Sequence, residues 1–310
     1  MSASANPTVP QRNRLSLWIQ AVRAFSFTAS VIPVLVGGLF ALGATGPKRW
    51  ALLPLAVLGG LLLHAGTNLI NDYYDFQRGV DREGTFGSSG ILVAGLMPPR
   101  SIFLGALVAF GLTVAIGVVL VAERGWPMLL LGGTGLLGGY LYSGRPVGYK
   151  YLALGDLLVF VLMGPLMVLG GYLTVTGQFR HEVLLLSLPI GCLVAGILCA
   201  NNLRDIEHDG EAKIITLARL LGHRAGKVEY TLLVLGAYAS VAVLVPAKVL
   251  SPWTLLVLLS SPLAVKNLSL VLRSREGEAR DLAFADVQTA QLHMVFGVLL
   301  GVGIVLGATL

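Results

Sequence analysis

The chain has 310 residues, of which 55% are apolar and 12% charged, with a mean hydropathy of +0.80 and a net charge of +6. An ordinary soluble globule is excluded, because such proteins carry about 25% charged residues. The positive charges are scattered over short loops without a basic stripe or nucleic-acid-binding motif, so we expect a lipid bilayer and no nucleic acid as the partner.

Nine apolar segments divide the chain, and each is long enough for a helix to cross about 30 Å of hydrocarbon. They lie at residues 18–43, 51–72, 101–122, 126–143, 152–175, 183–204, 229–246, 252–272 and 288–309. We therefore predict an all-α, polytopic membrane protein with nine transmembrane helices. Residues 1–14 are polar and contain two prolines, so we expect a disordered cytoplasmic tail followed by a single membrane domain over residues 15–310.

The loops between these segments differ in positive charge. Of the 22 Lys and Arg residues, 17 lie in the N-terminal segment and in the loops on the same predicted side, and five lie on the opposite side. By the positive-inside rule, the N-terminus is then cytoplasmic and the C-terminus lies outside. The expected location is the inner cell membrane, with the longest loops, 76–100 and 209–228, on the cytoplasmic face.

Two similar polar runs end the second and sixth apolar segments. They are Asn68-Leu-Ile-Asn71-Asp72-Tyr-Tyr-Asp75 and Asn202-Leu-Arg204-Asp205-Ile-Glu-His-Asp209. Side chains three and four residues apart share one face of a helix. Eight of the 16 acidic residues lie in these runs or directly after them. Such crowding of carboxylates predicts bound cations, and a helix bundle would bring both runs to one cavity at the cytoplasmic face.

The oxygen atoms of these runs suit a hard cation. Carboxylate and amide oxygens of Asn71, Asp75, Asp205 and Asp209 are ligands that Mg²⁺ prefers, and substrate phosphates commonly complete its shell. No cluster of His or Cys has the spacing of a zinc site. The cations available to a diphosphate are Arg78, Arg145, Lys150, Arg204 and Lys213. The simpler interpretation is that these residues are interfacial charges, which are normal at helix ends.

Several isolated residues admit two interpretations. Arg23 begins the first apolar segment, where it either marks the interface or faces a phosphate. His64 and His293 lie in apolar segments and are interpreted as core residues. The sequence Gly133-Thr-Gly135-Leu-Leu-Gly138 matches a nucleotide-binding pattern, but no strand precedes it and it lies in an apolar segment. We interpret it as a helix-packing surface.

The paired runs resemble the two signature motifs of the UbiA family of intramembrane aromatic prenyltransferases. The likeness rests on Asn71-Asp72-Tyr-Tyr-Asp75 with Asp81, and on the run from Asn201 to Asp209 followed by Thr216-Leu-Ala. Within the family, Phe25 to Pro33 and Leu154-Gly-Asp156 resemble the 1,4-dihydroxy-2-naphthoate prenyltransferases of menaquinone synthesis. One departure is Lys213-Ile-Ile, where the family tends to have Gly-Lys-Arg.

This resemblance implies a nine-helix bundle with a central cavity, in which Mg²⁺ binds the diphosphate of a polyprenyl donor. The implied catalytic residues are Asp72, Asp75, Asp205 and Asp209. The implied metal ligands are Asn71, Asp75, Asp205 and Asp209. The residues expected to bind substrate are Asn68, Asn71, Arg78, Asp81, Tyr140, Arg145, Lys150, Asn202, Arg204 and Lys213.

The expected reaction transfers a polyprenyl group to an aromatic acceptor, with loss of the carboxylate of 1,4-dihydroxy-2-naphthoate to give demethylmenaquinone. Other acceptors stay open, namely 4-hydroxybenzoate, homogentisate, haem or a glycerol phosphate lipid. A cation or solute transporter with paired intramembrane acids is an alternative from another class. A homo-oligomer is compatible with the sequence but is not required by it.

Overall fold

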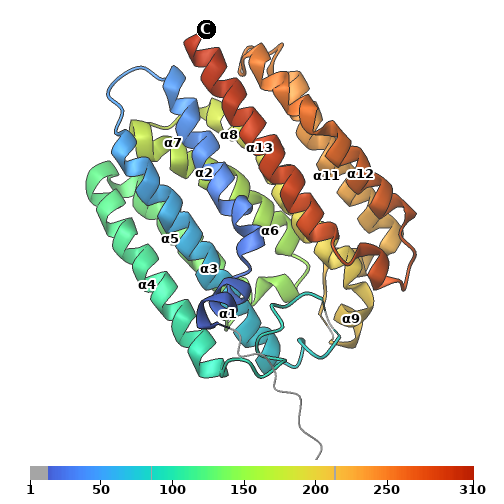
Figure 1. Ribbon diagram of the computed structural model, residues 1–310. Coiled ribbons are helices and arrows are strands. Elements are labelled where there is room, and N and C mark those ends of the chain that lie inside the picture. Colours follow the sequence, from blue (N-terminus) through green and yellow to red (C-terminus); the bar gives the residue numbers. More distant parts are fainter. Residues whose placement is uncertain (1–12, 85, 213) are drawn as a thin grey trace, which may run out of the picture.

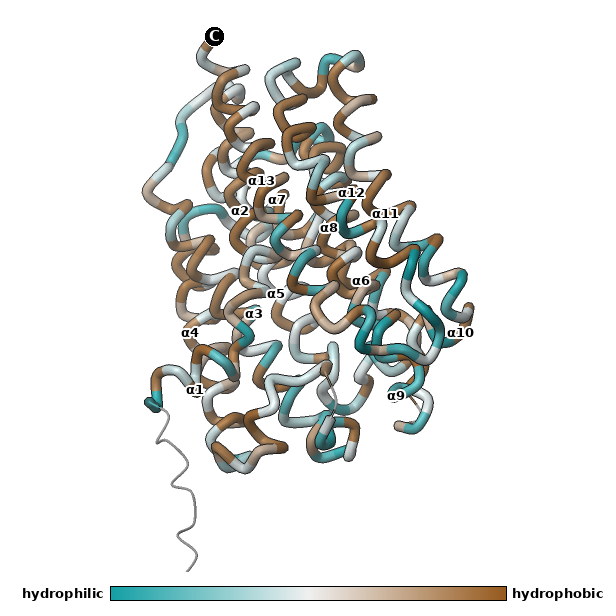
Figure 2. Tube along the Cα trace, turned by 45° about the vertical axis from the view of Figure 1, so that its right-hand side comes forward, coloured by the Kyte–Doolittle hydropathy of each residue, from teal (hydrophilic) through white to brown (hydrophobic). Residues whose placement is uncertain are grey.

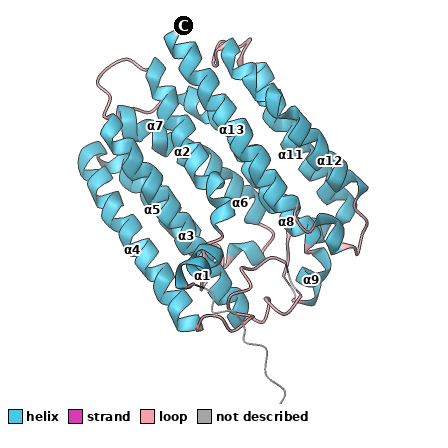
Figure 3. Cartoon of the chain, viewed as in Figure 1, coloured by secondary structure: helices cyan, strands magenta, loops and turns pink. Residues whose placement is uncertain are grey.

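The computed structural model describes residues 13–84, 86–212 and 214–310, which form a bundle of long helices (Figure 1). The described residues contain helices, turns and one isolated β-bridge between Leu152 and Ile215 (Figure 3). Residues 1–12 of the predicted cytoplasmic tail lie outside the described residues. Asn13 caps the first helix by accepting a hydrogen bond from the backbone of Leu15 at 3.1 Å.

The helices follow the apolar segments of the sequence. In chain order they are α1 (Arg14–Ala21), α2 (Thr28–Phe40), α3 (Leu53–Gln77), α4 (Pro99–Arg124), α5 (Trp126–Leu141), α6 (Gly155–Val161), α7 (Met167–Thr176), α8 (His181–Arg204), α9 (Ile206–Glu211), α10 (Leu217–Leu221), α11 (His223–Leu244), α12 (Ser261–Arg273) and α13 (Ala285–Thr309). Helices α6 and α7 are joined through a π-helical turn that contains Pro165.

Eight described segments are long and apolar enough to cross a bilayer, and they coincide with eight of the nine predicted segments. The all-α, polytopic membrane class is therefore confirmed. The remaining predicted segment, 126–143, forms α5, which has 16 residues. At about 1.5 Å per residue this helix is about 24 Å long, shorter than the hydrocarbon thickness. The count of nine spans stays a prediction.

Close helix packing replaces the hydrophobic effect inside a bilayer, where lipid is as apolar as the side chains. The crossing of α2 and α7 depends on glycine for this reason. A Cβ atom at Gly37 would lie 1.9 Å from the carbonyl oxygen of Val168, and one at Gly171 would lie 2.1 Å from that of Val34. Any larger residue at either position would therefore push the two backbones apart.

The two ends of the bundle differ in polarity. Hydrophobic residues follow the long helices, whereas hydrophilic residues gather around α9 and α10 (Figure 2). The C-terminal ends of α3 and α8 reach this polar end, and the chain's C-terminus lies at the opposite end (Figure 1). Both acidic runs are thus carried to the same, polar end of the bundle.

Candidate active site

The two acidic runs meet around one small cavity of about 50 Å³. Its lining includes Asp75 and Asp81 from the first run and its following loop, and Asp205 and Asp209 from the second. Asp156, at the start of α6, adds a fifth carboxylate. Residues more than 120 positions apart in the sequence are therefore brought together, as the helix-bundle argument predicted.

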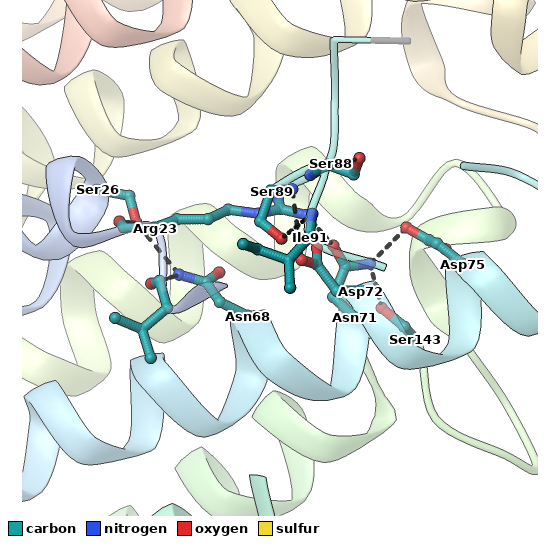
Figure 4. Close-up of polar contacts among 12 residues, drawn as sticks. Arg23, Ser26, Asn68, Asn71, Asp72, Asp75, Ser88, Ser89, Ile91 and Ser143 are labelled. Carbon is teal, nitrogen blue, oxygen red and sulfur yellow. Dashed lines mark hydrogen bonds and ion pairs between the residues drawn. The ribbon is translucent and has the colours of Figure 1, made fainter. Parts of the chain in front are cut away.

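The Asp75 side chain accepts three hydrogen bonds. Its carboxylate accepts bonds from Lys150 Nζ at 2.5 Å, from the Tyr151 hydroxyl at 2.5 Å and from Asn71 Nδ2 at 2.8 Å. Asn71 Nδ2 also donates to Ser143 Oγ at 2.8 Å (Figure 4). Burial opposes the charge on Lys150, but Asp75 outweighs it and raises the lysine pKa. The loop after α5 therefore supplies the cation that neutralises this carboxylate.

Arg23 holds the other acid of the first run. Its guanidinium pairs with Asp72 and donates from Nη2 to Asn71 Oδ1 at 3.2 Å (Figure 4). The backbone N–H of Ser89 donates to Asp72 Oδ2 at 3.3 Å. The backbone of Arg23 has φ 54°, in the left-handed region that a non-glycine residue adopts only at a cost. That unusual turn between α1 and α2 directs the side chain toward α3.

In the second run, Arg204 is the central cation. It donates from Nε and Nη2 to the two carboxylate oxygens of Asp205 at 2.8 and 2.9 Å, and from Nη1 to Asp286 at 3.0 Å. Its side chain is only 1% exposed. The helix breaks at Asp205 between α8 and α9, yet Asp209 N still donates to the Asp205 carbonyl at 2.8 Å. The spacing of one helical turn is therefore kept across the break.

Two carboxyl groups at this end have strongly raised pKa values. Burial, with Asp205 as the next cause, raises the pKa of Asp209 to about 7. Burial, with Asp75 as the next cause, raises the pKa of Asp81 to about 7. Both shifts follow from desolvating negative charges beside other negative charges. A bound cation would relieve the same repulsion.

The loop between α3 and α4 covers the second run. A Cβ atom at Gly87 would lie 3.0 Å from Asp205 Oδ2, and the Phe86 ring lies 5.6 Å from the Arg204 guanidinium carbon. Gly87 lines both the small cavity and a larger neighbouring one. The loop thus closes the polar end of the bundle over the carboxylates.

A larger cavity of about 600 Å³ adjoins the small one. The two share Gly87, Tyr142, Lys150, Leu198 and Asn201. Away from this shared boundary, the larger cavity runs between α3, α4, α5 and α7 and is lined mainly by apolar side chains and glycine. A charged group at the carboxylates and a hydrocarbon chain in the larger cavity can therefore belong to one ligand.

The remaining predicted substrate-binding residues lie in different settings. Asn68 lines the larger cavity, and Asn202 donates to both oxygens of Asp156 at 3.0 Å. The Arg78 guanidinium lies over the Tyr151 ring, 4.1 Å from its centroid. Tyr140 lines neither cavity and lies 3.3 Å, hydroxyl to hydroxyl, from Tyr74.

Two further predicted cations stand apart from the cavities. Arg145 is exposed and lines neither cavity. Lys213 lies outside the described residues. Of the four predicted diphosphate-binding cations that the structure describes, Lys150 and Arg204 are the ones hydrogen-bonded to motif carboxylates.

The structure adds residues that the predicted set omitted. Tyr151 bonds to Asp75, Ser143 to Asn71, and Asp286 to Arg204. The tyrosine-rich loop 142–151 was visible as a polar insertion between apolar segments. Asp286, at the start of α13, carried no comparable signal, because its partner lies 82 positions earlier in the chain.

The donor set fits a divalent cation that shares its shell with a phosphate. In the parts of the chain that the structure describes, no group of three His, Cys, Asp or Glu side chains forms a complete metal site. Mg²⁺ commonly uses only one or two carboxylates, with waters and substrate phosphates as the remaining ligands. The oxygens of Asp75 and Asp209 around one cavity meet that smaller requirement.

Comparisons with known proteins agree with this geometry. The UbiA prenyltransferase family matches residues 30–295. A 1,4-dihydroxy-2-naphthoate octaprenyltransferase of Bacillus subtilis is 35% identical over 302 residues, covering 96% of each chain. Human UbiA prenyltransferase domain-containing protein 1 is 31% identical over 311 residues, covering 96% of this chain and 87% of the human one.

Solved structures share the fold at low identity. A UbiA homologue from Aeropyrum pernix has a TM-score of 0.67 at 18% identity and covers 92% of this chain and 98% of its own. A homologue from Archaeoglobus fulgidus, bound to DMAPP and Mg²⁺, has a TM-score of 0.61 at 18% identity, with 92% and 99% covered. The matched family and the relatives that extend over nearly the whole chain lead to one conclusion: this chain belongs to the UbiA prenyltransferase family and is an integral membrane prenyltransferase.

Proposed function

We propose that this protein transfers a polyprenyl group from polyprenyl diphosphate to 1,4-dihydroxy-2-naphthoate, with Mg²⁺ as cofactor. The prenyl group replaces the ring carboxylate, which leaves as CO₂, and the products are diphosphate and the reduced (quinol) form of demethylmenaquinone. The observation that carries the proposal is the junction of two cavities, one lined by carboxylates of both motifs and the other by apolar side chains. The naphthoate acceptor is supported by the relative from Bacillus subtilis, whose name states that substrate.

The donor's two ends match the two cavities. Asn71, Asp75, Asp205 and Asp209 would hold Mg²⁺, which would neutralise the diphosphate as a leaving group. Lys150 lies where both cavities meet, so its ammonium can contact the same diphosphate. The apolar wall of the larger cavity accommodates the isoprenoid chain by excluding water.

The residues around the carboxylates also determine what happens when the C–O bond breaks. The allylic carbocation is stabilised by electron-rich faces and destroyed by water. Tyr142 lines both cavities, and its ring packs edge-on against Tyr149 with centroids 5.4 Å apart. The phenol ring of Tyr142 can therefore face the cation, while the loop that carries Phe86 and Gly87 limits the entry of water.

The membrane orientation is part of the proposal. The excess of Lys and Arg on one side supports a cytoplasmic N-terminus, an outer C-terminus and an active site that opens to the cytoplasm. A soluble aromatic acid and Mg²⁺ would then enter from the cytoplasm, whereas the hydrophobic donor would enter from the bilayer of the cell membrane.

The site is tested by substituting one acid from each run. Asp75→Ala and Asp209→Ala are each expected to abolish Mg²⁺-dependent formation of the prenylated naphthalene by purified protein in nanodiscs. Asp281→Ala is the matched control, because Asp281 forms an exposed pair with Arg275 and lines neither cavity. Normal turnover by either cavity variant would refute the site.

Acceptor identity requires a separate experiment. The purified protein is incubated with one radiolabelled prenyl diphosphate and each of five acceptors: dihydroxynaphthoate, 4-hydroxybenzoate, homogentisate, haem and a glycerol phosphate lipid. Preferred transfer to dihydroxynaphthoate supports the proposal. Preferred transfer to another acceptor would keep the prenyltransferase activity and overturn the naphthoate assignment.

A further inference from the structure

A polar cluster lies in the larger cavity and includes Asn68, the first residue of the first acidic run. It consists of Ser26, Ser30, His64 and Asn68, in which two short segments of the chain face each other. His64 and Asn68 are one turn apart on α3. Ser26 lies just before the start of α2, and Ser30 lies in the first turn of α2. Ser26, His64 and Asn68 line the cavity, whereas Ser30 is fully buried behind them.

The hydrogen-bond partners of His64 accommodate a tautomer with the proton on Nδ1. Ser30 Oγ lies 3.1 Å from the Phe27 carbonyl and 3.1 Å from His64 Nδ1, so when it donates to the carbonyl it accepts from Nδ1. A neutral imidazole has one N–H and one lone pair. In this arrangement the proton is on Nδ1, and Nε2 is a hydrogen-bond acceptor.

Nε2 lies near Ser26, which lines the cavity, whereas Nδ1 lies near the fully buried Ser30. Ser26 Oγ is 3.3 Å from Nε2, but Ser26 Oγ also donates to the Arg23 carbonyl at the shorter distance of 2.9 Å. When the Ser26 proton takes the shorter bond, the lone pair of Nε2 is free to accept a proton donor from the cavity. Leaving such an acceptor without a partner is unfavourable in an apolar surrounding.

Asn68 adds a second hydrogen-bond acceptor to the cluster. Its Nδ2 donates to the Val22 carbonyl at 2.9 Å and to Ser26 Oγ at 3.3 Å, so both amide hydrogens are used. The side chain then has its carbonyl oxygen left for a ligand, and that oxygen is also an acceptor. A surface of neutral acceptors matches an O–H group and disfavours a carboxylate.

The position of the cluster fits a second substrate. His64 precedes Asn71 by seven residues, which places the two on one face of α3 about 10 Å apart along the axis. That separation leaves room for a ring between the diphosphate end and the histidine. The Phe27 ring, edge-on to His64 with centroids 5.7 Å apart, adds an aromatic wall.

We propose that the cluster of Ser26, Ser30, His64 and Asn68 binds a ring hydroxyl of the aromatic acceptor, with His64 Nε2 accepting the hydrogen bond. This inference rests on the proposed prenyl transfer and names the residues that recognise its acceptor. As the ring attacks the allylic cation, positive charge spreads to the hydroxyl and makes it a better donor. The bond to Nε2 is therefore stronger in the transition state than in the ground state.

Two substitutions of His64 separate binding from structure. Asparagine can place its amide near Nδ1 and keep the bond to Ser30, but it does not reach the position of Nε2. Glutamine is longer and can present its carbonyl oxygen near Nε2. We expect His64→Asn to raise the KM for dihydroxynaphthoate by about tenfold or more, and His64→Gln to stay within about threefold of wild type. His181→Asn is the control, because His181 is exposed and lies at the start of α8, at the other end of that helix from the second acidic run.

The donor reports on whether the site is intact. Affinity for geranyl diphosphate with Mg²⁺, measured without acceptor, is expected to be unchanged in all three variants. A second readout is discrimination against a monomethoxy analogue of dihydroxynaphthoate. The wild type should prefer the free hydroxyl in kcat/KM by about 10²-fold or more, and His64→Asn should lose most of that preference.

The outcomes distinguish this inference from the proposed function. If the wild type prenylates no hydroxylated ring, the proposed function fails. If the wild type is active and His64→Asn keeps its acceptor KM and its discrimination, the hydroxyl site fails alone. Equal losses of donor affinity and acceptor KM in both His64 variants would assign the cluster a purely structural role and also overturn the inference.

Discussion

Removal of Arg204 should destabilise the protein more than removal of any exposed cation. The guanidinium contacts two acids, Asp205 and Asp286, through three hydrogen bonds of 2.8–3.0 Å, and its side chain is 1% exposed. Deleting one partner of a buried ion pair costs about 3–5 kcal/mol, because the other charge stays buried without compensation. We expect Arg204→Met to lower the free energy of unfolding by about this amount.

Arg204→Lys should have an intermediate effect. An ammonium keeps the charge but lacks the planar fork that reaches both oxygens of Asp205 and also Asp286, so we expect a loss of about 1.5–3 kcal/mol. The measurement is thermal unfolding of the purified protein in detergent, at pH 7.5 without divalent cations. The melting temperature should fall in the order wild type, Arg204→Lys, Arg204→Met. Arg275→Met is the matched control, since the Arg275 side chain is 72% exposed in its pair with Asp281. Its melting temperature should equal that of the wild type. An Arg204→Met protein with the wild-type melting temperature would refute the reasoning.

Two further predictions concern pH and donor length. Because burial raises the pKa of Asp209 to about 7, the neutral form favours the folded state; that contribution is complete below about pH 4 and is lost as pH rises through 7. Thermal unfolding without divalent cations should therefore occur at lower temperature at pH 8 than at pH 6, and Mg²⁺ should raise the melting temperature more at pH 8; an equal increase at both values would contradict this. Gly133 lines the larger cavity, and a Cβ there would meet no atom within 4 Å. Gly133→Phe should therefore shift relative use of donors from long polyprenyl diphosphates toward geranyl diphosphate by about tenfold in a competition assay. Gly111→Phe is the control, because a Cβ at Gly111 also meets no atom within 4 Å but Gly111 does not line the cavity. The same shift in both variants would show that the isoprenoid chain of the donor does not pass Gly133.

The class of the fold and the core of the site follow from local sequence. Apolar length alone located the long helices, because a backbone in lipid must satisfy its hydrogen bonds internally. Asp75 and Asp209 were recognisable because each lies one helical turn after another oxygen-bearing side chain at the end of an apolar run. We could predict that they meet around one cavity because both runs end at the same predicted face of the membrane.

Contacts between distant segments were beyond the sequence. Asp75 receives Lys150 and Tyr151 from a loop 75 and 76 positions later. His64 was interpreted as a core residue because its own helix is apolar, but its ring bonds to serines 38 and 34 positions earlier and lines a cavity. His293 met the same interpretation, and it is fully buried. Both histidines lie in apolar helices, yet one lines a cavity and the other is buried. Tertiary packing, which the local sequence does not reveal, decides between the two.

Charge balance around the cavities explains why metal and diphosphate should bind together. Among the described residues, six carboxylates line the two cavities, together with the cations Lys150 and Arg23, and Arg204 pairs with two of the six, Asp205 and Asp286. The carboxylates still outnumber these three cations. A free diphosphate would meet this acidic excess and be repelled, while a divalent cation alone would be attracted but would find few ligands already arranged around one point. Each ligand supplies what the other lacks, since the cation reduces the repulsion and the phosphate completes its coordination shell. Thermodynamic linkage then requires that each increase the affinity of the other by the same factor.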